Sequence, residues 1–198
     1  MNCGKIILHL CADIGSDSQP YRDAGYDVRC VGKDIGAENY RPPENVYGII
    51  ANPPCTMFSL ARTNAKNARD LSEGMRLVKE CLRIIWECQM RIESDQQKYS
   101  PLKFWCLENP NRGMLKWFLG EPYFVYSPDE YGDDYQKQTA LWGMFSRPVK
   151  TYAKTQKTKF DLMKSKDIHP EYFGQLTRQE RRSICSQKFA KAFFEVNQ

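Results

Sequence analysis

The chain has 198 residues, of which 41% are hydrophobic and 27% charged, a size and composition typical of one globular domain rather than a disordered or fibrous protein. Its net charge of +5, from 29 basic and 24 acidic residues, permits a nucleic-acid partner without requiring one. No apolar run approaches the roughly 18 residues that a membrane span needs, so we expect no membrane partner.

Short apolar runs recur along the chain and predict strands. The predicted strands cover residues 6–11, 26–31, 46–51, 104–107 and 139–144. Apolar spacing predicts helices over residues 72–93 and 178–197. Nearly unbroken apolar strands with helices between them indicate an α/β domain, in which a mostly parallel sheet is covered on both faces.

The sequence indicates where the first predicted helix begins and which face of each predicted helix is buried. Ser72 is a candidate N-cap of the first helix. The buried face of that helix is predicted to comprise Met75, Val78, Leu82, Ile85 and Ile92. The buried side of the closing helix is predicted to comprise Phe189, Phe193 and Val196.

Eight cysteines are scattered along the sequence, and none forms a Cys-x-x-Cys pair. With only two histidines, His9 and His169, this spacing does not fit a zinc site, and we expect no metal. Most of the cysteines lie in apolar runs, where a reduced thiol packs as a small hydrophobic side chain. This pattern indicates a reduced protein of the cytoplasm.

Unusual polar residues follow three of the predicted strands. Asp13 and Gly15 come after the first strand, residues 52–55 after the third, and Glu108 after the fourth. In a parallel sheet, ligands bind beyond the carboxyl ends of the strands. The sequence therefore predicts a functional site at this edge.

Cys55 differs from the other cysteines because Pro53 and Pro54 precede it. Two prolines neither extend a strand ladder nor begin a regular helix there, so the thiol is presented on a stiff turn. A nucleophilic cysteine needs a nearby cation to lower its pKa, and Arg62 or Lys137 could supply that charge. A turn that merely buries a small side chain fits the same residues.

Two acidic residues are candidates for roles beside Cys55. Glu108 alone is typical of a capping or turn-forming acid, but it ends a different strand of the predicted sheet. It could therefore converge with Cys55 on one substrate, as acid and nucleophile. Asp34 follows Gly15 at about the interval at which an acid reaches a ribose hydroxyl in dinucleotide-type folds, although a solvated loop aspartate is the alternative.

Three segments together carry a family resemblance. Pro53-Pro54-Cys55-Thr56-Met57-Phe58-Ser59 resembles the Pro-Pro-Cys-Gln-x-Phe-Ser signature of the DNA cytosine-5 methyltransferases, with Thr56 in place of the glutamine. Leu107-Glu108-Asn109-Pro110 resembles their Glu-Asn-Val motif, in the Glu-Asn-Pro version of the short bacteriophage and prophage forms. Residues 131–143 are similar to the short forms' Lys-x-Thr-x-Leu-Trp segment. The motifs occur in family order across nearly the whole chain.

The resemblance implies a single three-layer, Rossmann-like methyltransferase domain over residues 1–198. It implies transfer of a methyl group from S-adenosylmethionine to C5 of cytosine in DNA, after the base has been flipped out of the duplex. Cys55 would add to C6 of the ring, Glu108 would hold N3 and the exocyclic amine, and Lys137 would lie near the base's carbonyl. Such an enzyme would work in the cytoplasm of a bacterium or a phage-infected cell, where it could shield phage DNA from restriction.

The resemblance also implies a cofactor site around the turn after the first strand. The implied cofactor residues are Cys11, Ala12, Asp13, Ile14, Gly15, Asp34 and Asn52. Asp13 stands where the family has a glycine, which adds bulk and charge where the backbone normally approaches the cofactor's methionine. We therefore expect binding of S-adenosylmethionine that is weak for the family.

The DNA partner is expected to contact a basic stretch. Residues 147–166 contain seven cations and one acid, and residues 146–182 occupy the family's place for target recognition but are too few for a full second domain. The candidate DNA contacts are Ser59, Arg62, Lys154, Lys157 and Lys159. Lysines there would bind phosphates rather than base edges; a solvated lysine-rich loop is the alternative.

Two other functions compete with cytosine-5 methylation. An amino-methyltransferase is one, since Asn-Pro-Pro-aromatic motifs serve exocyclic nitrogens, but Cys55 stands where the aromatic residue should be. The other is a methyltransferase fold retained as a DNA- or protein-binding module. The altered turn at Asp13 favours that module, whereas the presence of Cys55 and Glu108 opposes it.

Overall fold

The computed structural model describes residue 2 and residues 4–12, 14–60, 66–90, 102–133, 135–151, 158–159, 172 and 174–198. Six strands form one sheet in the order β2-β1-β3-β4-β7-β5. Their bounds are β1 (Ile6–Leu10), β2 (Asp27–Val31), β3 (Val46–Ala51), β4 (Phe104–Pro110), β5 (Phe124–Tyr126) and β7 (Thr139–Met144). A separate two-stranded sheet pairs β6 (Tyr135–Gln136) with β8 (Thr158–Lys159).

The large sheet is mostly parallel. Strands β2, β1, β3 and β4 pair in parallel, whereas β7 is antiparallel to both of its neighbours, β4 and β5. The protein is therefore an α/β protein with a mixed sheet, which is compatible with a Rossmann-like fold. The predicted parallel sheet is confirmed for its first four strands.

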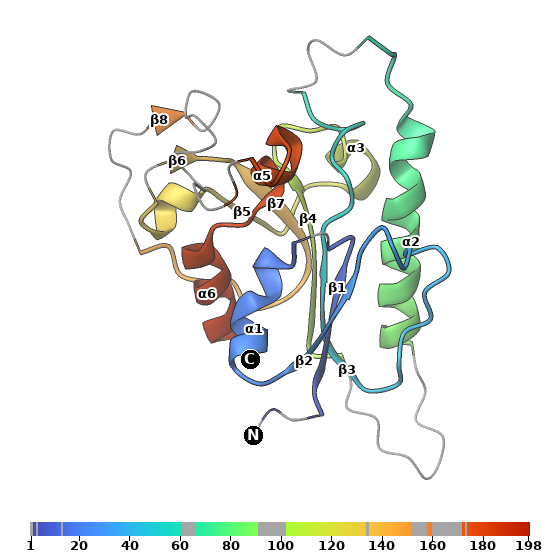
Figure 1. Cartoon of the computed structure of the whole chain (residues 1–198), viewed down its shortest axis with the longest axis vertical. Helices are drawn as coiled ribbons and strands as arrows, with labels where there is room; N and C mark the ends of the chain where they lie inside the picture. The colour runs from blue at the N-terminus through green and yellow to red at the C-terminus, as the bar shows by residue number, and fades with distance from the viewer. Residues whose placement is uncertain are drawn as a thin grey trace.

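Helices lie on both faces of this sheet (Figure 1). Helices α1 (Gln19–Asp23) and α6 (Gln187–Val196) cover one face, and α2 (Leu71–Gln89) covers the other. Shorter helical segments are η1 (Ser16–Ser18), α3 (Lys116–Leu119), η2 (Pro128–Tyr131) and α5 (Arg178–Ser183).

Alternation along the strands divides the core into two layers. In β4, Leu107 packs with Val78 and Ile84 of α2, whereas Phe104 and Cys106 belong to the cluster on the side of α1 and α6. Glu108 has the same parity as Cys106, so its side chain starts from the α1 and α6 face of the sheet.

Several predicted boundaries differ from the structure. Strand β4 continues to Pro110 because Glu108, Asn109 and Pro110 pair with β7. Helix α2 is capped by Asp70 rather than Ser72, since the Asp70 carboxylate accepts a hydrogen bond from the Glu73 backbone N–H at 2.9 Å.

The prediction of one continuous helix over residues 178–197 was wrong. This segment is divided into α5 and α6, and Ser186 caps the second of these by accepting a hydrogen bond from the Phe189 N–H at 3.1 Å. Phe189 and Phe193 are buried as expected, but Val196 is 39% exposed. On α2 the predicted Val78 and Ile85 are buried, while Ile92 lies outside the described residues.

The sheet order predicts a binding crevice at the carboxyl ends of β1 and β3. The chain leaves β1 toward β2 on one side, and β3 then pairs on the other side of β1. The connections after β1 and after β3 therefore leave the sheet in opposite directions. Open α/β sheets bind ligands between two such connections, at the carboxyl ends of the strands. The turns after β1 and β3 therefore flank the expected binding crevice.

The described residues also bear on membranes, metals and cysteines. None of their helices is both long and apolar enough to cross a membrane, and none of their His, Cys, Asp and Glu side chains gather in threes as a metal site would need. Four of the described cysteines are buried, namely Cys81, Cys88, Cys106 and Cys185.

Candidate active site

A buried histidine joins the two turns that flank the crevice. His9 Nδ1 lies 2.9 Å from Ser18 Oγ, and His9 Nε2 lies 3.2 Å from Asn52 Oδ1. Ser18 Oγ in turn donates to the Gly15 carbonyl at 3.1 Å. Burial lowers the pKa of His9, and the charge of Asp17 opposes this shift in part. The histidine therefore connects the turn after β1 to the turn after β3.

A hydrogen bond from Asn109 anchors the turn that carries Cys55. Asn109 is fully buried in β4, and its Nδ2 donates to the Pro53 carbonyl at 3.0 Å. This bond ties the Pro-Pro-Cys turn to the strand that carries Glu108, the residue directly before Asn109. The spacing of Cys55 relative to Glu108 is thus set by a hydrogen bond between two different elements.

Hydrogen bonds to the backbone carbonyls of Cys55 and the residues after it also fix this turn. The Cys55 carbonyl accepts the backbone N–H groups of Phe58 and Ser59 at 3.0 and 2.8 Å. Arg69 then donates to the carbonyls of Met57 and Ser59 at 2.9 and 2.8 Å. Backbone carbonyls on both sides of Cys55 are therefore satisfied, which makes this turn a fixed platform for the thiol.

Cys55, Glu108 and Lys137 lie within electrostatic reach of one another. Burial raises the pKa of the Glu108 carboxyl from its usual 4.5 to about 7, with Lys137 opposing the rise and Asp17 adding to it. Burial, and next the charge of Glu108, raise the pKa of the Cys55 thiol, whereas Lys137 and Arg182 lower it. The structure thus brings together the three residues that the sequence singled out for chemistry.

These charges couple the proton of Glu108 to that of Cys55. When Glu108 is protonated, the carboxylate charge that raises the Cys55 pKa is gone. A Cys55 thiolate beside a neutral Glu108 carries the same net charge as a thiol beside a carboxylate, so one proton can be held at either residue. Such a pair can present a nucleophile and a proton donor to one substrate at the same time.

The turn after β1 contains most of the candidate cofactor residues. Cys11 has a φ of 56°, a left-handed conformation that is uncommon for a residue with a side chain. Gly15 has a φ of 73°, and an added Cβ would lie 3.2 Å from Cys30 Sγ, so this position needs glycine. Ala12 is buried and Ile14 partly buried.

The remaining cofactor candidates lie on neighbouring segments. Asn52 donates its backbone N–H to the Leu10 carbonyl at 3.0 Å, directly beside the turn after β1. Asp34 is exposed and lies three residues beyond the end of β2. Asp13 lies outside the described residues. The cofactor roles of all these residues stay predictions.

The turn after β1 is also contacted by the C-terminal segment. Ser16 Oγ accepts the Cys185 backbone N–H at 3.0 Å, and the Ser16 carbonyl accepts Gln187 Nε2 at 3.3 Å. These residues lie between α5 and the first turn of α6. The two hydrogen bonds join residues that are 169 and 171 positions apart in sequence. A remote segment of the chain therefore supports this turn.

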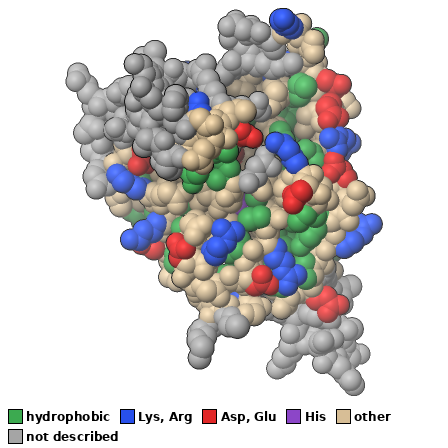
Figure 2. Space-filling model, in the orientation of Figure 1, with side chains coloured by type: hydrophobic (Ala, Val, Ile, Leu, Met, Phe, Trp, Pro, Cys, Tyr) green, Lys and Arg blue, Asp and Glu red, His purple; other side chains and the backbone are tan. Residues whose placement is uncertain are grey.

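The candidate DNA contacts are only partly described. Arg62, Lys154 and Lys157 lie outside the described residues. Ser59 forms an isolated bridge with Gly113. The backbone of Lys159 pairs with Gln136, the residue before Lys137. On the face in Figure 2, described basic and acidic side chains are interspersed rather than separated by sign.

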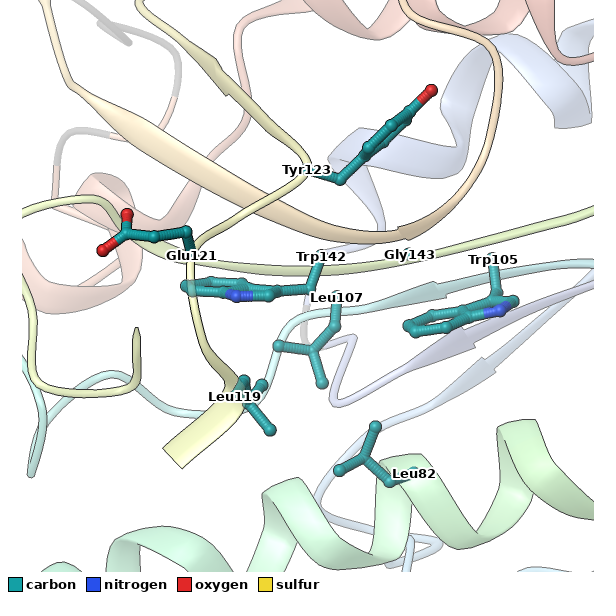
Figure 3. A pocket seen from close by; sticks show the side chains of 8 residues that line it. All are labelled: Leu82, Trp105, Leu107, Leu119, Glu121, Tyr123, Trp142 and Gly143. Carbon is teal, nitrogen blue, oxygen red and sulfur yellow. The ribbon is translucent and has the colours of Figure 1, made fainter. Parts of the chain in front are cut away.

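A cavity of about 360 Å³ lies elsewhere, on the α2 side of the sheet (Figure 3). Its lining residues are Leu82, Trp105, Leu107, Leu119, Glu121, Tyr123, Trp142 and Gly143. None of the candidate site residues is among them, and the Glu121 side chain is 83% exposed. An apolar cavity with one solvated carboxylate does not provide a nucleophile and an acid, so the crevice remains the candidate active site.

Four residues of this site were not predicted from the sequence. His9 was considered only as a possible metal ligand, and Asn109 only as part of a motif. Asp17 and Arg182 carried no pattern that set them apart from surface charges. The position of Asp17 two residues after Gly15 was the one available signal, because a turn at the end of β1 brings such a residue back toward the crevice.

Comparison of the sequence with models of protein families found no match, and comparison with curated proteins found no relative.

Proposed function

We propose that this protein transfers a methyl group from S-adenosylmethionine to C5 of cytosine in DNA through a covalent bond to Cys55. The observation that carries the proposal is that the turn of Cys55 is bonded to the strand of Glu108 through Asn109, with Lys137 within electrostatic reach of both. These residues come from the turn after β3, from β4 and from the segment before β7. An acid whose pKa is about 7 beside a thiol on a fixed turn is the equipment that the reaction needs.

Each residue has a distinct task in this chemistry. Cys55, as a thiolate, forms a bond to C6 of the ring while Glu108 delivers its proton to N3. The electron pair displaced from the C5–C6 double bond is then available at C5, for which the bound cofactor supplies an electrophilic methyl group. Glu108 takes the N3 proton back once C5 is methylated, and loss of the C5 proton to a base then restores the C5–C6 double bond and expels the Cys55 thiolate. Lys137 lowers the cost of negative charge on the thiolate.

The crevice between the turns after β1 and β3 fits the cofactor in two respects. Gly15 provides a left-handed turn with a φ of 73°, a conformation that a residue with a side chain rarely adopts. Cys11, Ile14 and Asn52 lie around the same crevice and are all partly exposed. These residues would hold the cofactor next to the turn that presents Cys55.

Trapping of the adduct tests the proposal. Duplex DNA containing 5-fluorocytosine should form a stable complex with the protein and S-adenosylmethionine, because fluorine cannot leave C5 as a proton. Cys55→Ser should abolish the complex, whereas Cys88→Ser, which changes a buried thiol of α2, should not. Wild-type methylation by Cys55→Ser, or N-methylated bases among the digested nucleosides, would overturn the mechanism. Absence of cofactor binding even with DNA would favour the binding module.

A further inference from the structure

Two cysteines from different layers of the fold are in direct contact beside the crevice. Cys11 Sγ lies 3.8 Å from Cys81 Sγ, although 70 residues separate them in sequence. Cys11 is the first residue after β1, and Cys81 lies in the middle of α2. Neither thiol has a part in the chemistry proposed for Cys55.

The surroundings of the two thiols differ. Cys81 is fully buried, as are Val78 and Ile84 on the same helix, so its position is fixed by the core. Cys11 is partly exposed and lies on the turn that flanks the crevice. An oxidant that enters the crevice therefore meets Cys11 first.

We propose that Cys11 and Cys81 form a reversible disulfide when the protein meets a peroxide, and that this bond weakens binding at the crevice. The first half of the proposal concerns the two thiols alone. The second half rests on the proposed function, because it identifies the crevice as the cofactor site.

The chemistry balances with a peroxide as the oxidant. The Cys11 sulfur attacks one peroxide oxygen, the O–O bond breaks, and Cys11 becomes a sulfenic acid while an alcohol or water leaves. The Cys81 sulfur then attacks the Cys11 sulfur, the S–O bond breaks, and water leaves with the Cys81 proton. The two thiols thus lose two electrons to the peroxide, and a dithiol reductant returns them.

The contact between the two thiols and the difference in their burial indicate which cysteine is oxidised first and which one closes the disulfide. The hydrogen bond with Cys11, followed by burial, raises the pKa of Cys81 well above its usual value. A protonated, buried thiol is a poor first target for a peroxide. Cys81 is therefore the partner that closes the disulfide, and Cys11 is the residue that is oxidised first.

Bond formation has to move the turn after β1. The sulfurs must approach from 3.8 Å to about 2.05 Å. Cys81 belongs to a helix of 19 residues with several fully buried side chains, so it resists movement. The shift then falls on Cys11, whose φ of 56° already places it in an uncommon conformation, and it displaces Ile14 and Gly15 with it.

Peptide mapping tests the disulfide without reference to methyl transfer. Reduced full-length protein would be treated with hydrogen peroxide, alkylated and digested with trypsin. We expect residues 6–22 to be joined to residues 80–83 with the loss of two hydrogens, and we expect dithiothreitol to separate them. Cys81→Ala and Cys11→Ser should each abolish the joined peptide, and Cys88→Ala, on the same helix, should retain it. Over-oxidation of Cys11 with Cys81 left as a thiol would overturn the proposal.

Calorimetry then tests the consequence for the crevice. S-adenosylmethionine would be titrated into reduced and oxidised Cys55→Ser protein, in which the nucleophile cannot be oxidised. We expect about tenfold weaker binding after oxidation, equivalent to ~1.4 kcal/mol, and no such loss when Cys81→Ala is added. Equal affinity in both states would overturn the regulatory half. A reduced protein that does not bind the cofactor would instead contradict the proposed function, while the peptide map would still decide the disulfide.

Discussion

The turns after β3 and β1 flank the same crevice, yet different interactions hold them. The turn after β3 is fixed by hydrogen bonds from Asn109 and Arg69 to its backbone carbonyls. The turn after β1 carries Cys11 in a left-handed conformation against Cys81 and depends on contacts from the C-terminal segment to Ser16. One turn is anchored in the sheet core, and the other is supported by a remote part of the chain.

This difference separates chemistry from binding in the proposed function. A nucleophile must be held within fractions of an ångström of its target atom, which suits the turn anchored by buried hydrogen bonds. A binding turn can adjust to its ligand and can respond to a change in its supports. Substitutions near β4 should therefore affect the chemical step, and substitutions near Ser16 should affect cofactor affinity.

The largest effect is expected from Glu108→Gln. Glutamine keeps the shape of the side chain but cannot deliver a proton to N3, so kcat should fall by roughly 10² to 10⁴. Cofactor affinity should stay within about twofold, because Glu108 lies on β4 and not on the turn after β1. Single-turnover methylation and calorimetry would measure the two quantities.

The pKa shifts of Glu108 and Cys55 also predict the direction in which activity changes with pH. The wild-type pair must lose one proton to reach the state with a Cys55 thiolate and a neutral Glu108, so kcat/KM should rise with pH through about 7. Glu108→Gln also removes a negative charge that raises the Cys55 pKa, so Cys55 should react with iodoacetamide at lower pH than in the wild type. An unchanged alkylation profile would show that the two groups are not coupled.

A smaller effect is expected from Asn109→Ala. The change leaves the buried Pro53 carbonyl without its donor, which should cost about 2 kcal/mol of unfolding free energy. It should also lower kcat while leaving the affinity for S-adenosylmethionine unchanged, since the turn after β3 loses its anchor. Urea denaturation and calorimetry would measure these quantities.

Asn111→Ala is the matched control for Asn109→Ala. Asn111 is two residues further on, and its side chain makes one long, exposed hydrogen bond to Gln138 at 3.5 Å, so the loss of that bond should cost less than about 0.5 kcal/mol. If both variants lose the same stability and activity, the buried bond to Pro53 does not position Cys55.

The sequence predicted the sheet better than it predicted the site. Residues 46–51 were recognisable as a strand because all six are buried between two helical layers and therefore apolar. The extension of β4 through Glu108 was not recognisable, because its cause is pairing with β7, about 30 residues later in the chain. Polar residues in a strand have no periodic signal when their partner strand is distant in sequence.

Motif residues were easier to find than the residues that hold them. Cys55 and Glu108 were identified because their neighbours are unusual, and the structure places them together. Asn109 and His9 act through hydrogen bonds to other elements, which no local pattern reveals. The division of residues 178–197 into two helices was likewise hidden, because Ser186 caps α6 in a stretch whose composition also suits a continuous helix.

The smallest effect is expected from Ser16→Ala. The change removes the oxygen that accepts the Cys185 N–H at 3.0 Å, a loss that should cost about 1 kcal/mol in unfolding free energy. Because the C-terminal segment then holds the turn after β1 less firmly, the affinity for S-adenosylmethionine should fall by a few fold. The rate at which iodoacetamide alkylates Cys55 should stay unchanged, since the turn after β3 keeps its bonds from Asn109 and Arg69. Ser72→Ala, on the exposed side of α2, should change neither quantity. Slower alkylation of Cys55 with unchanged cofactor affinity would reverse the division of labour between the two turns.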